Sequence, residues 1–167
     1  MNAAKSVDAP NGYRPTVLIV DDEELVTISL RNLFLLQSDY NVLTHTSPSE
    51  ALSAAKNLSV DLVISDYLMP ELDGIAFLSQ LREIQPQTVR VLLTGYADKE
   101  NAIRAINSIG LYQYIEKPWD NEKLLIVVKN GIEKRALLRA LEIKIAELAE
   151  AHSSLKSIQT ELIKAFM

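Results

Sequence analysis

The chain has 167 residues, 48% hydrophobic and 23% charged, which is enough to bury the core of one domain and to add an appendage. Its net charge of −5 and the lack of a basic stripe argue against direct nucleic-acid binding, and the absence of cysteine excludes disulfides and thiolate metal sites. No apolar run approaches the ~20 residues of a membrane span, and residues 1–15 lack the apolar core of a signal peptide, so we expect a cytoplasmic protein with no membrane contact.

Five short apolar runs alternate with helical patterns along the chain. Residues 1–15 contain prolines and a glycine and predict a flexible lead-in. The predicted strands cover residues 16–20, 41–46, 62–66, 89–93 and 112–116. Strand–helix alternation without hairpin signals predicts an α/β fold, a doubly wound five-stranded parallel sheet with helices on both faces. We assign this domain to residues 16–131 and a helical extension to residues 132–167.

Capping signals mark the predicted helices between these strands. Ser47 and Glu50 suit the N-cap and third positions of the second helix, with Pro48 at its first position. Asp73 opens the third helix, and Gly110 closes the fourth. Apolar spacing predicts the inner faces of the first four helices, made by Val26, Leu30, Leu33, Phe34, Ala51, Ala55, Leu58, Leu78, Leu81, Ile84, Ala102, Ile106 and Ile109.

Polar residues follow four of the five predicted strands. Asp21 and Asp22 follow the first, Asp66 ends the third, Thr94 follows the fourth, and Lys117 follows the fifth. Each has an ordinary role when taken alone: acids favour a helix N-terminus, and a hydroxyl or a lysine is common at a strand end. The carboxyl ends of parallel strands meet at one edge, where α/β sheets bind ligands. Together, the carboxylates suit Mg²⁺ and the hydroxyl and ammonium suit a phosphoryl group, which favours an aspartate that accepts phosphate.

Residues 16–130 closely resemble the receiver domain of two-component response regulators. The resemblance implies the (βα)5 flavodoxin-like fold and phosphorylation by a sensor histidine kinase. It also implies that the protein is not an enzyme beyond self-phosphorylation and self-dephosphorylation. The motifs that carry it are Val20-Asp21-Asp22-Glu23, Asp66-Tyr67-Leu68-Met69-Pro70 with Asp73-Gly74, Leu93-Thr94-Gly95 and Tyr114-Ile115-Glu116-Lys117-Pro118.

The resemblance implies a role for each acid of the predicted site. Asp66 matches the phosphoacceptor. Asp21 and Asp22 match the Mg²⁺ site, with Asp66 and the backbone carbonyl of Leu68 as further ligands. The side chains of Leu68 and Tyr96 match the positions that flank the path of the hydrolytic water. Because both are large, we expect a long-lived phosphoryl group.

The resemblance also implies roles for the residues after the last two strands. Thr94 and Lys117 match the groups that contact the phosphoryl oxygens. Tyr114 matches the aromatic side chain that moves inward with Thr94 as the switch. The bond between Lys117 and Pro118 matches a peptide bond that is usually cis in the family.

A heptad pattern runs through the C-terminal extension and predicts a coiled coil. We expect a parallel homodimer through residues 138–166. Ala151 and Ile158 offer a competing register after Leu148, and a helix folded back on its own domain is the alternative to a dimer. The heptad positions are Leu138, Leu141, Ile145, Leu148, His152, Leu155, Gln159, Leu162 and Phe166.

Two further interpretations concern the function of the whole chain. Residues 155–167 resemble signalling coils that precede histidine-kinase dimerisation domains and also fit a linker to an HD-type phosphodiesterase, so we expect an output module of one of these kinds beyond Met167. A haloacid-dehalogenase-like phosphatase is a rival, but it needs a second acid two residues after the nucleophile, where Leu68 stands. A coiled-coil adaptor that no longer switches is a third interpretation, against which the intact acid set argues.

Overall fold

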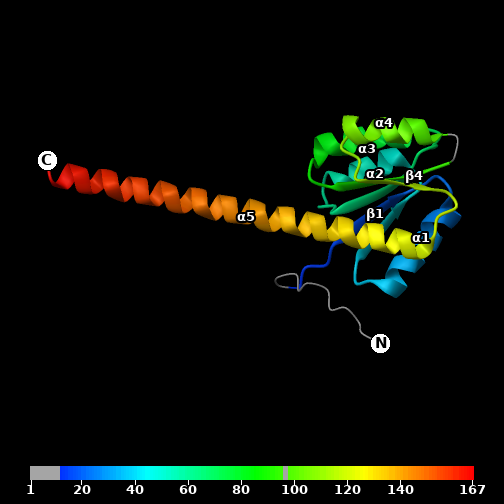
Figure 1. Cartoon of the computed structure of the whole chain (residues 1–167), viewed down its shortest axis with the longest axis horizontal. Coiled ribbons are helices and arrows are strands. Elements are labelled where there is room, and N and C mark those ends of the chain that lie inside the picture. The colour runs from blue at the N-terminus through cyan, green and yellow to red at the C-terminus, as the bar shows by residue number, and fades with distance from the viewer. Residues whose placement is uncertain (1–11, 96–97) are drawn as a thin grey trace. The chain divides into compact units, whose positions relative to one another are not determined.

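The computed structural model describes residues 12–95 and 98–167, except the side chains of Lys99 and Ala105. Its five strands form one parallel sheet in the order β2-β1-β3-β4-β5 (Figure 1). The predicted fold is therefore confirmed, and predicted and observed strand bounds differ by at most one residue. The strands are β1 (Thr16–Val20), β2 (Asn41–His45), β3 (Leu62–Asp66), β4 (Val89–Thr94) and β5 (Gln113–Glu116).

The helices follow the strands in alternation. They are α1 (Glu24–Gln37), α2 (Pro48–Ala55), α3 (Gly74–Ile84), α4 (Lys99–Ser108) and α5 (Asn121–Ala165). The Ser47 side chain caps α2 by accepting a hydrogen bond from the Glu50 N–H, and the Asp73 side chain caps α3 in the same way. Gly110 has a φ of 63°, the left-handed conformation predicted after α4.

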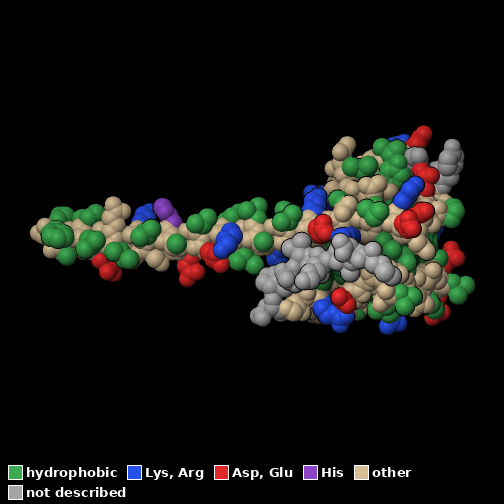
Figure 2. All heavy atoms as spheres, turned by 60° about the horizontal axis from the view of Figure 1, so that its bottom comes forward, with side chains coloured by type: hydrophobic (Ala, Val, Ile, Leu, Met, Phe, Trp, Pro, Cys, Tyr) green, Lys and Arg blue, Asp and Glu red, His purple; other side chains and the backbone are tan. Residues whose placement is uncertain are grey.

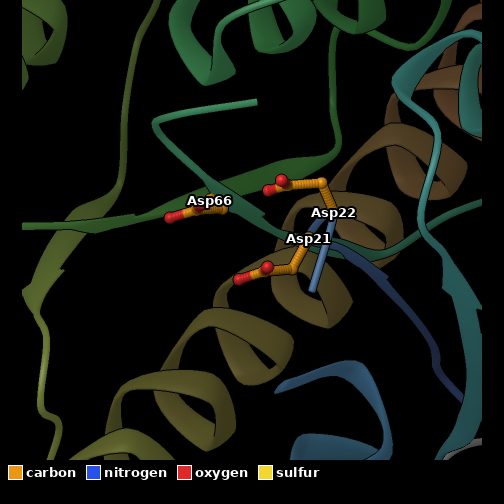
Figure 3. A group of neighbouring side chains, drawn as sticks. All are labelled: Asp21, Asp22 and Asp66. Carbon is orange, nitrogen blue, oxygen red and sulfur yellow. The ribbon is translucent and has the colours of Figure 1, made fainter. Parts of the chain in front are cut away.

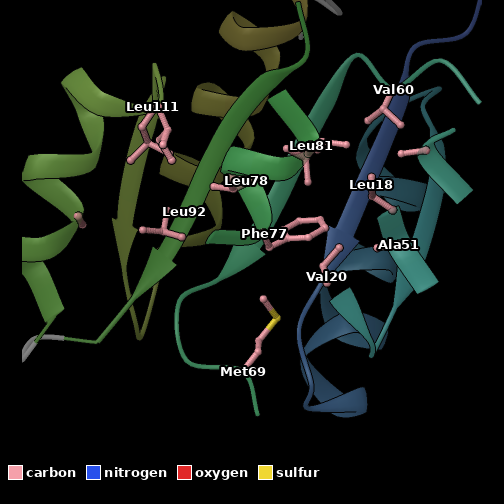
Figure 4. Close-up of a cluster of buried hydrophobic side chains, with 14 residues drawn as sticks. Leu18, Val20, Ala51, Val60, Met69, Phe77, Leu78, Leu81, Leu92 and Leu111 are labelled. Atoms are coloured by element: carbon pink, nitrogen blue, oxygen red, sulfur yellow. The ribbon is translucent and has the colours of Figure 1, made fainter. Parts of the chain in front are cut away.

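Two buried clusters lie on the two faces of the sheet. One contains Leu18, Phe77 and Leu92 and packs β1, β3 and β4 against α2 and α3 (Figure 4). The other contains Phe34 from α1 and Val128 from α5. All residues of β1, β3 and β4 are buried, as expected for strands covered by helices on both faces.

Two of the predicted inner-face positions are wrong. Leu58 is exposed because α2 ends at Ala55 and the chain turns before reaching it. Ile106 is exposed on α4, whose buried residues include Ala102, while Ile109 is buried just beyond the helix. Apolar spacing alone does not reveal where a helix stops or how far it is rotated on the sheet.

The chain divides into two compact units, residues 1–135 and residues 136–167. Helix α5 contributes to the first unit through its buried residues Leu124, Val128, Gly131 and Ile132. Of the expected flexible lead-in, residues 1–11 lie outside the described part. Within the described residues, no helix is long and apolar enough to cross a membrane.

Candidate functional site

The carboxyl ends of the strands bring the predicted polar residues to one edge of the sheet. Asp66 is the last residue of β3, and Thr94 is the last residue of β4. Asp21 follows β1, and its N–H donates to the carbonyl of His45 at the end of β2. Lys117 follows β5, and its N–H donates to the Thr94 carbonyl at 2.9 Å. The parallel register thus fixes the backbone around the site.

Three carboxylates converge at this edge. Asp21, Asp22 and Asp66 each offer one oxygen, and the three oxygens lie within 4.8 Å of one another (Figure 3). Asp21 and Asp66 are buried, whereas Asp22 is exposed. Hard oxygen donors that converge in this way, without sulfur or imidazole, fit Mg²⁺.

Lys117 forms salt bridges with two of these three acids. Its Nζ lies 2.9 Å from Asp66 Oδ1 and 3.0 Å from Asp21 Oδ2. Burial raises the pKa of Asp66; the hydrogen bond from Lys117 opposes this rise, and the Asp21 charge adds to it. Burial alone would lower the pKa of Lys117, but its hydrogen bonds to Asp66 and Asp21 outweigh burial and raise it. Lys117 is therefore held charged beside a carboxylate that pays a desolvation cost.

Thr94, Tyr114 and Leu68 lie in different environments. Thr94 is fully buried, and its hydroxyl donates to the Gly95 carbonyl at 3.1 Å. Tyr114 is half-buried on β5 and packs at the edge of the Leu18–Phe77 cluster. The Leu68 side chain is 64% exposed. Tyr96 lies outside the described residues.

Residues 17–129 match the response regulator receiver domain family. The chain belongs to this family. Receiver domains accept a phosphoryl group on an aspartate and bind Mg²⁺ through acidic residues. The peptide bond between Lys117 and Pro118 is cis, as the sequence resemblance implies.

Relatives of the receiver are larger proteins with different names. The hydrogenase transcriptional regulatory protein HoxA of Cupriavidus necator is 38% identical over 122 residues, which are 73% of this chain and 25% of HoxA. Histidine kinase P4 of Formosa agariphila is 30% identical over 153 residues, which are 90% of this chain and 11% of the kinase. The chain thus spans a quarter or less of these relatives.

One solved structure has the same fold as this chain over nearly the whole length of the solved domain. The signal receiver domain of an HD domain-containing protein from Pseudomonas fluorescens is 34% identical to this chain, with a TM-score of 0.69. The match covers 74% of this chain and 98% of that domain. The shared part is the receiver, and the match leaves about a quarter of this chain outside it.

Gly74 supports the receiver site in a way that the sequence did not reveal. A Cβ atom at this position would overlap the carbonyl oxygen of Asp66 and lie 2.9 Å from Leu92 Cδ1. The Gly74 N–H also donates to the Tyr67 carbonyl at 2.7 Å. The Asp73-Gly74 pair is part of the family motif, but only the coordinates show that the lack of a side chain lets α3 approach the strand that ends in Asp66.

Glu71 ties the loop after Asp66 to helix α2. Its carboxylate accepts hydrogen bonds from Ser49 Oγ at 2.7 Å and from Ser47 Oγ at 3.1 Å. These residues are more than 20 positions apart, so no local sequence signal could have paired them. The contact holds the loop that carries Leu68, whose carbonyl is the further ligand implied by the family resemblance.

Proposed function

We propose that this receiver accepts a phosphoryl group on Asp66 from a sensor histidine kinase and passes its state to an output module through a dimerising C-terminal helix. The observation that supports the proposal best is the position of Asp66. Asp66 ends β3 and is only 7% exposed, and its carboxylate lies against Lys117 and two further acids. No other aspartate among the described residues combines a strand end with both partners.

The transfer is a nucleophilic substitution at phosphorus. An oxygen of Asp66 forms the new P–O bond as the P–N bond to the donor histidine breaks, and the freed imidazole takes up a proton. Lys117 and the Thr94 hydroxyl contact the phosphoryl oxygens. Asp21, Asp22 and the Leu68 carbonyl would hold Mg²⁺ together with Asp66. The bound ion would offset the negative charge that gathers there.

The switch runs from the phosphoryl group to the strand beside it. Thr94 turns its hydroxyl toward the phosphoryl oxygen and leaves space that Tyr114 fills. Support comes from the register, in which Thr94 pairs with Glu116 and Leu92 pairs with Tyr114. The two switch residues therefore lie on neighbouring strands, two positions apart along the sheet.

This function needs no turnover of an external substrate. The only reactions we assign are phosphorylation and dephosphorylation of the receiver itself. An apolar, exposed Leu68 cannot supply the second acid that a haloacid-dehalogenase-like phosphatase uses, so we place that candidate second. A non-switching adaptor would keep the coil but would not take up phosphate.

The output module would lie beyond residue 167. Relatives that share this receiver are named as a transcriptional regulatory protein, a histidine kinase and an HD domain-containing protein. A receiver joined to different output modules fits these names. A parallel homodimer through residues 138–166 would present two receivers to one pair of output modules.

Incubation with acetyl phosphate and Mg²⁺ tests the proposal. Intact mass should increase by one phosphoryl group, and the increase should vanish in Asp66→Asn and in EDTA. Asp39→Asn is the matched control, because Asp39 is an exposed aspartate beside the amino end of β2. An unchanged mass in the wild-type protein, or full labelling of Asp66→Asn, would contradict the proposal.

A further inference from the structure

One ladder of four leucines runs through residues 136–167. Leu141, Leu148, Leu155 and Leu162 recur every seven residues and are 54–69% exposed. Hydrophobic side chains recur along this helix in Figure 2. Seven-residue spacing places the four leucines on one stripe, which a partner helix must cover if it is to be buried.

Two different sets of residues can complete this ladder. The heptad seam adds the residue four positions after each ladder leucine: after Leu148 it adds His152, Gln159 and Phe166. The shifted seam instead adds Ala151 and Ile158, which lie one residue earlier. Before Leu148 the heptad seam adds Leu138 and Ile145, whereas a shift there would bring in Leu137 and Lys144.

The heptad seam is favoured in the first half of the coil, because the shifted seam would bury Lys144 there, and the two seams compete in the second half. The second half has polar residues in the heptad seam and apolar residues in the shifted seam. Residues 152, 158 and 159 are all exposed in the helix, so its own fold does not select one seam.

We infer that a second copy of this chain docks in parallel on the leucine ladder and that the half after Leu148 alternates between the heptad seam and the shifted seam. This inference rests on the dimer proposed above and adds its regulation. Exchanging the seams rotates each helix by about 50°, half of the ~100° between consecutive residues. The ladder keeps its partner throughout, since its leucines belong to both seams.

Parallel pairing follows from the positions of the polar residues. In a parallel dimer each seam residue faces the same residue of the second copy, so Gln159 faces Gln159 and the two amides can hydrogen-bond. In an antiparallel dimer centred on residue 152, Gln159 would face Ile145 and lose that partner. A buried amide without a partner costs free energy, which disfavours the antiparallel arrangement.

The charge at residue 152 decides between the seams. In the heptad seam His152 faces His152 of the second copy, and the nearest charged side chain one turn on is Lys156, which opposes a positive imidazole. In the shifted seam His152 lies beside the interface and faces Glu147 of the second copy. Glu147 already lies 3.0 Å from Lys144 of its own helix, so it would bridge two cations. A neutral His152 favours the heptad seam, and a charged one favours the shifted seam.

Cysteine crosslinking tests this inference cleanly because the chain has no cysteine. Single cysteines at Ile158, Gln159 and Leu162 report the shifted seam, the heptad seam and the shared ladder. Each cysteine variant is combined with His, Leu or Lys at position 152, and all are oxidised at the same pH to form disulfides between the two copies. Constant pH keeps thiol reactivity equal between variants. Ser157→Cys, outside both seams, gives the background.

The shared ladder should crosslink through Leu162→Cys with every residue at 152. The ratio of Ile158→Cys to Gln159→Cys crosslinking should rise at least several-fold from His152→Leu to His152→Lys. Adding Glu147→Gln to His152→Lys should reverse most of that rise. If Leu162→Cys crosslinks but the ratio of Ile158→Cys to Gln159→Cys crosslinking is the same for every residue at 152, the seam exchange is overturned and the dimer is kept. No crosslink at Leu162→Cys overturns the parallel dimer as well.

Discussion

At the scale of single residues, the charges of the site destabilise the folded state. Asp66 is buried next to Asp21, and Lys117 neutralises only part of their charge. A buried carboxylate without full compensation destabilises the folded state. Phosphate or Mg²⁺ that binds only the folded receiver should restore that stability.

The stability of the wild type relative to Asp66→Asn should depend on pH in a defined direction. Because the pKa of Asp66 is raised above its ordinary value of 3.8, the folded state holds this proton more tightly than the unfolded state does. The free energy of unfolding therefore falls as pH rises from about 4 through the raised pKa. In urea unfolding with EDTA present, the unfolding free energy of Asp66→Asn should therefore rise relative to that of the wild type over this pH range.

Asp39→Asn, which removes an exposed aspartate away from the site, serves as the reference for that comparison. Added Mg²⁺ should raise the stability of the wild type more than that of Asp66→Asn. If the unfolding free energy of Asp66→Asn instead falls relative to that of the wild type as the pH rises, burial does not dominate the pKa of Asp66.

Leu68 should control the lifetime of the phosphoryl group. Its exposed side chain cannot orient a water molecule, whereas asparagine could donate one hydrogen bond worth about 1 kcal/mol. That energy corresponds to about fivefold in rate, so Leu68→Asn should speed dephosphorylation about fivefold. Phosphoryl release measured after removal of acetyl phosphate checks this. Leu36→Asn, at an exposed leucine of α1, should leave the rate unchanged, and an equal rate in both variants would refute the role of Leu68.

At the scale of elements, close approach of α3 to the end of β3 depends on Gly74. An added Cβ meets the backbone carbonyl of Asp66, which cannot move like a side-chain tip. Gly74→Ala should therefore destabilise the receiver by at least the roughly 1–3 kcal/mol typical of overpacking. Gly95→Ala is the control, because among the described residues its Cβ would meet only Asp98 Oδ2, at 3.7 Å. Equal unfolding free energies for the two variants would show that α3 shifts freely.

The elements also show what a sequence can and cannot predict. The strands were predictable because each is a continuous apolar run ended by a polar residue, and this placed Asp66, Thr94 and Lys117 at one edge. The error at Leu58 arose because helical spacing continues in the sequence after the helix has ended. The Glu71 contacts with α2 and the overlap at Gly74 depend on distances between separate segments, which no local pattern encodes.

At the scale of the whole molecule, the receiver and the C-terminal helix should assemble as a dimer. A leucine fully buried in the ladder contributes roughly 1.5–3 kcal/mol, so replacing Leu148 and Leu155 together by lysine should abolish association. Light scattering at tens of micromolar should give a dimer for the full chain and a monomer for the double variant. Ile143→Lys, outside both seams, should remain dimeric. A monomeric wild type under these conditions would contradict the coil.

The central claim is that Asp66 carries the phosphoryl group, and borohydride reduction tests it most directly. Reduction converts an aspartyl phosphate to homoserine, which marks the modified position permanently. Trypsin releases Asp66 in the peptide of residues 57–82 together with Asp61 and Asp73, so fragment masses must locate the homoserine. After labelling with acetyl phosphate and Mg²⁺, we predict homoserine at position 66 alone. Homoserine at position 61 or 73, or on another peptide, would contradict the account.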